Sequence, residues 1–262
     1  MVDASILSHV LDLLCSLLKN SKTEEDCAKV VAVFPVILKY VEKSDDMFLL
    51  LNGTQTLKTF IHLAHKQVLE LSTPEQIIAV CQKLLSPETN EQSALMLGNL
   101  IIQVIHKVQP RIDTMLLMCV VKKIYKSRMP SIVQSLVLIF ARLIHTNPKE
   151  IIEFLSETSI ENRISLKIVL DKWLLQQALF RGNYTRTVTI SALCKMFMMR
   201  HPSIETLMVI GYNPSHSNIN SEVNAPFKML SLMLRFLDNE TKPTKLRPMR
   251  QPIDFDPEED SK

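Results

Sequence analysis

Two histidines stand three residues apart, a spacing at which one helix can present two imidazoles to a metal ion. The pair is His62 and His65, and imidazole is a common zinc ligand. No third ligand with a recognisable spacing accompanies them. His65 also belongs to a series of histidines that we expect at helix ends, where a histidine favours the negative end of the helix dipole. We therefore interpret both residues as structural, and we predict neither a metal site nor a cofactor.

Cys194 and the methionines after it are the other side chains that could do chemistry. Cys194 could be a nucleophile, but it lies in the apolar run ISALCKMF with no histidine within one helical turn. Because an activated thiolate needs an electropositive environment, we expect an inert, packed thiol. The three methionines Met196, Met198 and Met199 could form a soft metal site or an adaptable peptide groove. Their helical spacing instead predicts core packing.

Glycine spacing excludes two large classes of enzyme. The four glycines are Gly53, Gly98, Gly182 and Gly211, and the closest pair is 29 residues apart (211 minus 182). Walker-type and dinucleotide-binding loops need clustered glycines that bring backbone N–H groups onto phosphate. A G-x-S-x-G hydrolase turn is also absent from the sequence, and the carboxylates form no outstanding pair. We predict that the chain is not an enzyme and has no catalytic residues.

Composition and charge indicate a globular chain with no strong electrostatic preference. Hydrophobic residues make up 47% and charged residues 22% of the 262, which supplies enough apolar surface for a core. The net charge of +3 implies no field that would attract nucleic acid. Apolar runs such as VVAVFPVIL are too short to cross a bilayer. We expect a chain that binds no nucleic acid directly and does not insert into membranes.

The cysteines and the first residues both point to the cytosol or nucleus. The five cysteines, at positions 15, 27, 81, 119 and 194, are odd in number and show no C-x-x-C spacing. That usage is typical of reduced thiols in an intracellular protein. The first residues have no basic start and carry Asp3 and Asp12, so we expect no secretory signal.

Capping residues mark the expected starts of helices. Thr73-Pro74-Glu75-Gln76 and Asn147-Pro148-Lys149-Glu150 each combine a capping side chain, a proline in the first turn and a side chain that can reach back. Thr89-Asn90-Glu91-Gln92 has the same pattern without the proline, and Thr23-Glu24-Glu25-Asp26 is a looser version. Each of these segments predicts a helix N-terminus.

The expected helices recur along the chain. His65, His106 and His145 fall near the ends of three successive apolar helices, at separations of 41 (106 minus 65) and 39 (145 minus 106). A period of about 40 residues is typical of HEAT and armadillo repeats. We therefore predict an all-α fold, a HEAT-type α-α superhelix built from antiparallel helix pairs. The second helices of three pairs are expected at Thr73 to Leu85, Ile112 to Tyr125 and Asn147 to Leu155, and the first pair at 3–19 and 24–41 with a kink or break at Pro35.

The segment FRGNY, residues 180–184, interrupts two helical stripes. One stripe ends at Trp173 and the next begins near Val188, so Gly182 falls where the chain must reverse. A ligand-binding loop is the alternative, but we interpret the segment as a connector over which Phe180 and Tyr184 fold back.

The last part of the chain differs from the repeats. Residues 211–224, GYNPSHSNINSEVN, read as a loop, and APFKMLSLMLRFL reads as a final helix. We assign residues 1–238 to the repeat array and residues 239–262 to a charged, proline-bearing, disordered tail. The tail is basic through Arg250 and then acidic in DFDPEED. No aromatic residues interleave the basic run, so a nucleic-acid site is not expected there.

A set of ordered matches carries a resemblance to the C-terminal region of importin-9-like receptors of the karyopherin-β (importin-β) family. The matches cover residues 50 to 200 best and are weaker at Asn52-Gly53 and LLSPET. No single motif is specific, but the ordered set is. Its members are Trp173, Gln177, Leu179, Phe180, Gly182, Tyr184, Val188, Ala192 to Lys195, Gln134 to Leu136, Phe140-Ala141, Leu143 to Thr146 and Glu153 to Leu155.

The resemblance implies a HEAT superhelix that acts in nuclear import without chemistry. It implies basic protein cargo such as histones or ribosomal proteins, release of cargo by GTP-bound Ran, contacts with nucleoporins, and a location in the cytoplasm, the nucleus and the nuclear envelope or pore. Such receptors bind Ran mainly through N-terminal repeats that this chain lacks, and their long acidic insertion is absent here or reduced to DFDPEED. The alternative is a generic HEAT or armadillo scaffold without a transport role. The expected cargo-binding residues are Asp254, Asp256, Glu258, Glu259 and Asp260.

Overall fold

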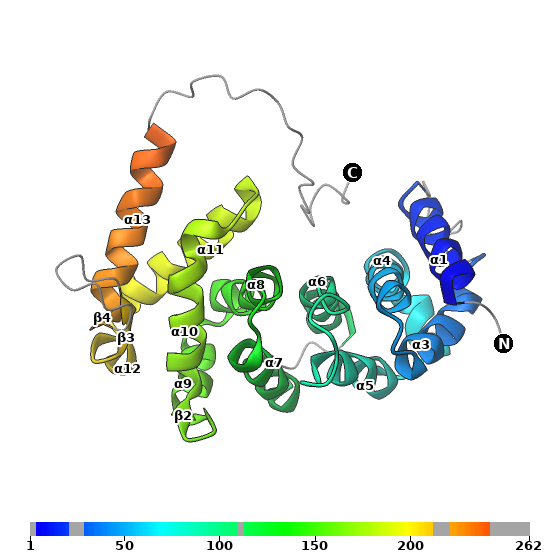
Figure 1. The fold of residues 1–262 in the computed structure, drawn as a ribbon, viewed down its shortest axis with the longest axis horizontal. Coiled ribbons are helices and arrows are strands. Elements are labelled where there is room, and N and C mark those ends of the chain that lie inside the picture. The colour runs from blue at the N-terminus through cyan, green and yellow to red at the C-terminus, as the bar shows by residue number, and fades with distance from the viewer. Residues whose placement is uncertain (1–3, 21–28, 109–112, 212–220, 242–262) are drawn as a thin grey trace. The chain divides into compact units, whose positions relative to one another are not determined.

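A computed structural model describes residues 4–20, 29–108, 113–211 and 221–241 of the chain (Figure 1). Helices make up most of the described residues, and two short β-hairpins are the strands among them. The chain divides into two compact units, Met1–Leu136 and Val137–Lys262, so the boundary falls inside one helix. The prediction of an all-α repeat fold is confirmed.

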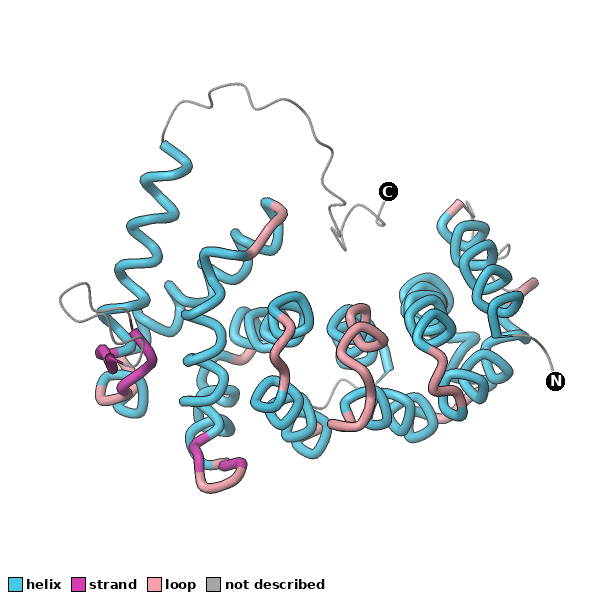
Figure 2. Tube along the Cα trace, viewed as in Figure 1, coloured by secondary structure: helices cyan, strands magenta, loops and turns pink. Residues whose placement is uncertain are grey.

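The first unit is a double row of helices (Figures 1 and 2). In one row α1 packs on α4 and α4 packs on α6, while in the other α3 packs on α5 and α5 packs on α7. Successive hairpins therefore stack in chain order, and each buries apolar surface that a single hairpin would leave exposed. The elements are α1 (Ala4–Lys19), the 3-10 turn η1 (Val31–Val33), α3 (Phe34–Lys43), α4 (Met47–Leu71), α5 (Pro74–Leu85), α6 (Leu97–Gln103), the π-helical turn η2 (Val104–Val108) and α7 (Thr114–Lys126).

The second unit adds two antiparallel hairpins to its helices. The turn of the first hairpin holds Glu161 and Asn162 at φ 49° and 62°, and the register of the second runs from Met208 opposite Asn224 to Gly211 opposite Ser221. The elements, from the helix that contains the unit boundary, are α8 (Pro130–Thr146), α9 (Pro148–Glu157), β1 (Ser159–Ile160), β2 (Arg163–Ile164), α10 (Ser165–Gln176), the 3-10 turn η3 (Gln177–Leu179), α11 (Asn183–Met199), α12 (Pro202–Glu205), β3 (Met208–Gly211), β4 (Ser221–Asn224) and α13 (Ala225–Thr241).

Two lysines link neighbouring hairpins of the first unit through backbone carbonyls. Lys83 of α5 donates to the carbonyl oxygens of Val41 and Ser44 at the end of α3. Lys123 of α7 donates to those of Ser86 and Thr89, after the end of α5, at 2.7 and 2.8 Å. The last carbonyls of a helix have no partner within that helix, so each ammonium group binds acceptors at or just after a helix end. The Ser86 carbonyl oxygen also accepts the Thr89 N–H at 3.1 Å. The two lysines are 40 residues apart (123 minus 83), which matches the predicted repeat.

The helix starts predicted at proline-bearing caps are confirmed. Thr73 and Gln76 form a reciprocal capping box before α5, with Thr73 Oγ1 3.4 Å from the Gln76 nitrogen and Gln76 Oε1 3.0 Å from the Thr73 nitrogen. Helix α9 begins at Pro148 as expected, but the Asn147 side chain caps no backbone N–H. Its amide instead donates to Glu150 Oε2 at 3.1 Å.

The helix start predicted at Thr89 to Gln92 is wrong, because its side chains have partners elsewhere. The segment forms turns, and α6 begins only at Leu97. Thr89 Oγ1 donates to the Lys83 carbonyl oxygen, and the Glu91 carboxylate accepts the backbone N–H groups of Arg128 and Met129, just before α8, at 2.6 to 3.2 Å. A carboxylate at the start of a helix is favoured by the helix dipole, so Glu91 supports a later helix instead of its own.

Two further expectations near the N-terminus agree in part with the structure. Residues 24–28 of the helix predicted at 24–41 lie outside the described residues, and the observed helix α3 begins at Phe34. Pro35 therefore lies in the first turn of α3, where no hydrogen bond is lost, and the break expected at Pro35 falls at the start of this helix. His65 directly follows Ala64, whose non-helical dihedral angles divide α4, so it lies at a break between two helical segments, although α4 as a whole runs to Leu71.

The loop expected at 211–224 is partly ordered. Gly211 ends β3 and residues 221–224 form β4, while residues 212–220 lie outside the described residues. The final helix runs to Thr241, four residues beyond the predicted end at Leu237. Residues 242–262 of the predicted tail also lie outside the described residues.

Gly98 is the point of closest approach between α6 and the first half of α8. A Cβ atom at Gly98 would lie 2.2 Å from the Ser135 carbonyl oxygen, a backbone atom that cannot move alone. Replacing glycine by alanine inside an ordinary helix stabilises it by about 0.5 to 1 kcal/mol. We expect Gly98→Ala to have the opposite sign and to lower the free energy of unfolding by about 1 to 3 kcal/mol. Urea unfolding followed by circular dichroism measures the change.

The neighbouring variant Asn99→Ala is the matched control, because Asn99 is only partly buried in the same helix. It should change the free energy of unfolding by no more than about 0.5 kcal/mol. A Gly98→Ala protein as stable as this control would show that α6 and α8 are farther apart than described.

Candidate functional site

The residues predicted to bind cargo cannot be placed. Asp254, Asp256, Glu258, Glu259 and Asp260 all lie outside the described residues. Their role in binding stays a prediction.

One histidine of the candidate metal pair, His62, contacts a side chain of a neighbouring helix. His62 Nδ1 lies 3.3 Å from Gln103 Oε1 of the neighbouring helix α6. Within the described ranges, no group of three or more histidine, cysteine, aspartate or glutamate side chains could hold a metal ion. His145, at the last turn of α8, has its Nε2 atom 3.0 Å from the Val188 carbonyl oxygen of α11.

Cys194 is packed against a second sulfur atom. Its thiol donates to Met233 Sδ at 3.0 Å, and burial raises the pKa of the Cys194 thiol above its ordinary value. Burial also raises the pKa of Cys81 to about 12, so neither thiol is activated as a nucleophile. Of the three methionines, Met196 is buried as predicted, but Met198 is 78% exposed and the expectation of core packing is wrong for it.

The FRGNY segment is a connector between α10 and α11. Gly182 has φ 83°, a conformation that glycine adopts without strain. Phe180 is buried, and Tyr184 lies under the guanidinium group of Arg142, 5.0 Å from the ring centre. The segment therefore closes a helix end, as predicted.

Near this connector, a buried series of hydrogen bonds links Trp173 of α10 to Thr189 of α11. Trp173 Nε1 donates to Gln177 Oε1 at 2.8 Å, and Gln177 Nε2 donates to Thr189 Oγ1 at 2.9 Å. The Thr189 hydroxyl in turn donates to the Thr185 carbonyl oxygen at 2.8 Å. Trp173 is 0% exposed, so the chain satisfies its indole N–H inside the core.

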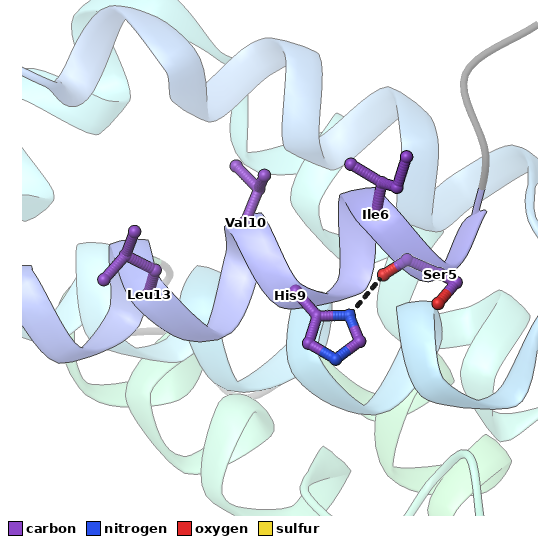
Figure 3. A pocket seen from close by; sticks show the side chains of 5 residues that line it. All are labelled: Ser5, Ile6, His9, Val10 and Leu13. Carbon is purple, nitrogen blue, oxygen red and sulfur yellow. Dashed lines mark hydrogen bonds between the residues drawn. The ribbon is translucent and has the colours of Figure 1, made fainter.

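Helix α1 carries an apolar stripe that the described residues leave uncovered. Ile6, Val10, Leu13 and Leu17 are each more than half exposed. Figure 3 shows three of them on one helix, with the His9 ring turned back to the Ser5 carbonyl oxygen at 2.7 Å. The side chains around this shallow surface all come from α1, so it offers apolar contact without converging polar groups.

A second apolar surface is a groove of about 480 Å³ in the second unit. Its walls come from the end of α10, the β3–β4 hairpin and α13, and the side chains of Leu175 and Phe227 are 55% and 68% exposed there. Lys228 and Arg235 are the charged residues of the lining, and no carboxylate is among the described residues that line it. This groove therefore combines exposed apolar side chains with positive charge.

Polar contacts fix the hairpin that forms one wall of the groove. Asp171 of α10 accepts the Ile210 N–H at 2.7 Å, and Lys167 of the same helix pairs with Glu222 of β4 at 2.9 Å. From the other side, Lys228 of α13 donates to the Ile210 carbonyl oxygen. Desolvation lowers the pKa of Lys228, while Asp171 acts in the opposite direction. The wall is thus held from both helices.

Sequence comparison assigns this helical array to a known family. A family model described as importin-11-like TPR repeats matches residues 3–212. The chain belongs to the importin-β family. The family resemblance carried by Trp173 to Lys195 and the upstream matches is thereby confirmed.

Individual importins show the same relationship over part of their length. The chain is 31% identical to importin-9 of Drosophila melanogaster over 196 residues, which is 71% of this chain and 19% of that protein. Importin subunit beta-5 of Saccharomyces cerevisiae is 27% identical over 138 residues, 52% of this chain and 14% of that protein. Importin subunit beta-5 of Schizosaccharomyces pombe is 21% identical over 196 residues, 71% of this chain and 20% of that protein. The importin chain thus spans a fifth or less of the length of these relatives.

The groove of the second unit was missed in the sequence. The groove is built from segments about 50 residues apart, from Leu174 to Phe227, so no local motif predicts it. On α1, only the apolar positions that face α4 are buried. No helix among the described residues is both long enough and apolar enough to cross a membrane.

Proposed function

We propose that the chain binds protein cargo as a helical-repeat segment of an importin-type nuclear transport receptor. Membership of the importin family over residues 3–212 is the observation that carries this proposal. The stacked hairpins of the first unit support it, because stacked helical repeats present extended protein-binding surfaces. No chemistry is required of the chain.

The proposed cargo is basic protein such as histones or ribosomal proteins, bound in part by the acidic end of the chain. Five carboxylates fall within seven residues, from Asp254 to Asp260. Such a cluster attracts lysine-rich surfaces, and contacts between exposed charges weaken as salt screens them. Binding of a basic cargo should therefore fall as ionic strength rises.

Neutralising the acidic cluster tests the cargo site. The variant carries Asp254→Asn, Asp256→Asn, Glu258→Gln, Glu259→Gln and Asp260→Asn. We expect it to bind a purified core-histone dimer about tenfold more weakly at low salt, from several exposed ion pairs of at most about 1 kcal/mol each. The difference should vanish at high salt. Fluorescence anisotropy of labelled histone measures both affinities.

The matched control removes the same number of negative charges from helices and one turn of the two units. It carries Gln at Glu42, Glu70, Glu88, Glu157 and Glu205, all of which are exposed. If this control loses as much affinity as the tail variant, net charge and not the acidic cluster governs binding. Equal binding by the tail variant and the unaltered chain would contradict the cargo site.

The transport role separates the proposal from a generic helical-repeat scaffold. We propose that a receptor containing this chain and the Ran-binding N-terminal repeats moves between cytoplasm and nucleus and contacts nucleoporins. Such a receptor should accumulate at the nuclear rim and release basic cargo when GTP-loaded Ran is added, but not when GDP-loaded Ran is added. A scaffold would keep its cargo in both cases.

A further inference from the structure

The groove of the second unit selects a particular kind of ligand. Its wall exposes the Leu175 and Phe227 side chains, which favour apolar anchors. Arg235 is exposed on the same side of α13 as Phe227, two helical turns further along. An apolar segment with acidic neighbours complements this surface better than a neutral or a basic segment does.

The same chain contains a segment with those properties. In the sequence PIDFDPEED, Ile253 and Phe255 alternate with Asp254 and Asp256. In an extended backbone, residues two apart point to the same side. Ile253 and Phe255 can then enter an apolar groove together, while both aspartates remain at its positively charged rim. We propose that residues 252–260 dock in the groove formed by α10, the β3–β4 hairpin and α13 of the same chain.

The connection to α13 is long enough for this contact. Helix α13 ends at Thr241, which leaves 12 residues up to Ile253 (253 minus 241). These can span up to about 40 Å, whereas Phe227 is only about 21 Å back along the helix at 1.5 Å per residue. A segment tethered this closely has an effective concentration on the order of millimolar. A contact with a dissociation constant in the millimolar range is therefore half occupied.

Flanking prolines reduce the entropy that docking costs. Pro252 fixes its own φ angle, and Pro257 disfavours helical dihedral angles at Asp256. The sequence therefore restricts the backbone at Pro252 and biases Asp256 toward the extended conformation that the contact needs. A ligand that already favours its bound conformation loses less entropy on binding.

Photo-cross-linking in the full chain tests the contact directly. Phe255 is replaced by p-benzoylphenylalanine, which keeps an aromatic anchor, and irradiated protein is mapped by mass spectrometry. We expect cross-links within the chain to residues 174–178 or 227–235, with a yield that does not change on dilution. Cross-links confined to other elements, cross-links between copies, or no cross-link to the groove would each overturn the proposal.

A charge reversal with rescue identifies the rim contact. Arg235 is the residue to change, because Lys228 also holds the hairpin wall through the Ile210 carbonyl. Arg235→Glu should lower the cross-link yield on the order of threefold at low salt. Adding Asp254→Arg and Asp256→Arg to that variant should restore the yield. Loss without rescue would mean that Arg235 acts on the groove and not on the acidic segment.

Hydrogen exchange supplies a measurement that does not depend on the cross-linker. Ile253→Ser combined with Phe255→Ser leaves the net charge of the full chain unchanged. We expect faster amide exchange at residues 174–178 and 227–235 in this variant and no change in α5, which is in the other unit. Unchanged exchange at the groove would overturn the proposal.

Docking and cargo binding would share the same carboxylates. If the proposed cargo site is also right, a basic cargo protein will compete with the groove for Asp254 and Asp256, and the core-histone dimer will lower the cross-link yield. The competition rests on the proposed function, but the docking itself does not. Cross-links that persist with histone present would contradict the shared site alone.

Discussion

Trp173→Ala is expected to lower the free energy of unfolding by about 3 to 5 kcal/mol, the range for truncating a fully buried large aromatic residue. Trp173 is 0% exposed, and its removal also takes the donor from Gln177 Oε1. A buried acceptor left without a partner adds to the cost. Chemical unfolding of the second unit, followed by circular dichroism and by proteolysis at α10 and α11, measures the loss.

Two matched variants separate the contributions to this loss. Leu175→Ala changes a residue of the same helix that is 55% exposed, and it should cost less than about 1 kcal/mol. Trp173→Phe keeps a ring but removes the indole donor. Its cost in free energy of unfolding should fall between those of Leu175→Ala and Trp173→Ala. If Trp173→Phe is as stable as the unaltered protein, the hydrogen bonds that link Trp173, Gln177 and Thr189 contribute nothing measurable to the free energy of unfolding.

Lys123→Met is expected to lower the free energy of unfolding of the first unit by about 2 to 4 kcal/mol. The Lys123 side chain is 2% exposed, and its ammonium group donates to two carbonyl oxygens. Methionine fills a similar volume, but the Thr89 carbonyl oxygen loses this donor and the Ser86 carbonyl oxygen keeps only the Thr89 N–H at 3.1 Å. A buried acceptor that loses its partner costs about 1 to 3 kcal/mol. Urea unfolding and hydrogen exchange at residues 86–91 measure the effect.

The adjacent Lys122 is the control, because it has the same side chain but is exposed. Lys122→Met should change the free energy of unfolding by no more than about 0.5 kcal/mol. Equal stability of the two variants would show that the ammonium group of Lys123 does not hold the loop after α5.

The contribution of Lys123 to the free energy of unfolding should change with pH in a definite direction. Desolvation lowers the pKa of Lys123 below its ordinary value of 10.5, and Glu91 acts in the opposite direction. Between the folded and unfolded pKa values the unfolded chain binds more protons, so the free energy of unfolding rises with pH. As pH rises through that window, the unaltered chain should gain stability relative to Lys123→Met. A constant difference between the two would contradict the lowered pKa.

Local features of the sequence were enough to predict the helix starts whose partners lie nearby. At Thr73 the cap and Gln76 bond to each other within three residues. In the segment from Thr89 to Gln92 the same pattern failed. Lys123 binds the Thr89 carbonyl oxygen, and the N–H groups of residues 128 and 129 bind the Glu91 carboxylate, each from more than 30 residues away. Long-range partners of this kind cannot be read from spacing in one segment.

The repeat period predicted the fold well but located no site. A regular spacing of apolar residues indicates which helices stack, since every repeat must bury one face against the next. It does not separate a buried methionine such as Met196 from its exposed neighbour Met198. The groove also depends on the β3–β4 hairpin, whose second strand lies in a segment that reads as a loop because of its polar residues.

The two lysine contacts of the first unit determine how its hairpins can deform. Apolar faces can slide past each other with little change in energy, because hydrophobic burial is non-directional. A donor at 2.7 Å from one carbonyl and 2.8 Å from another cannot slide without losing both bonds. Under load, α5 and α7 should resist shear and yield by opening on the side away from Lys123.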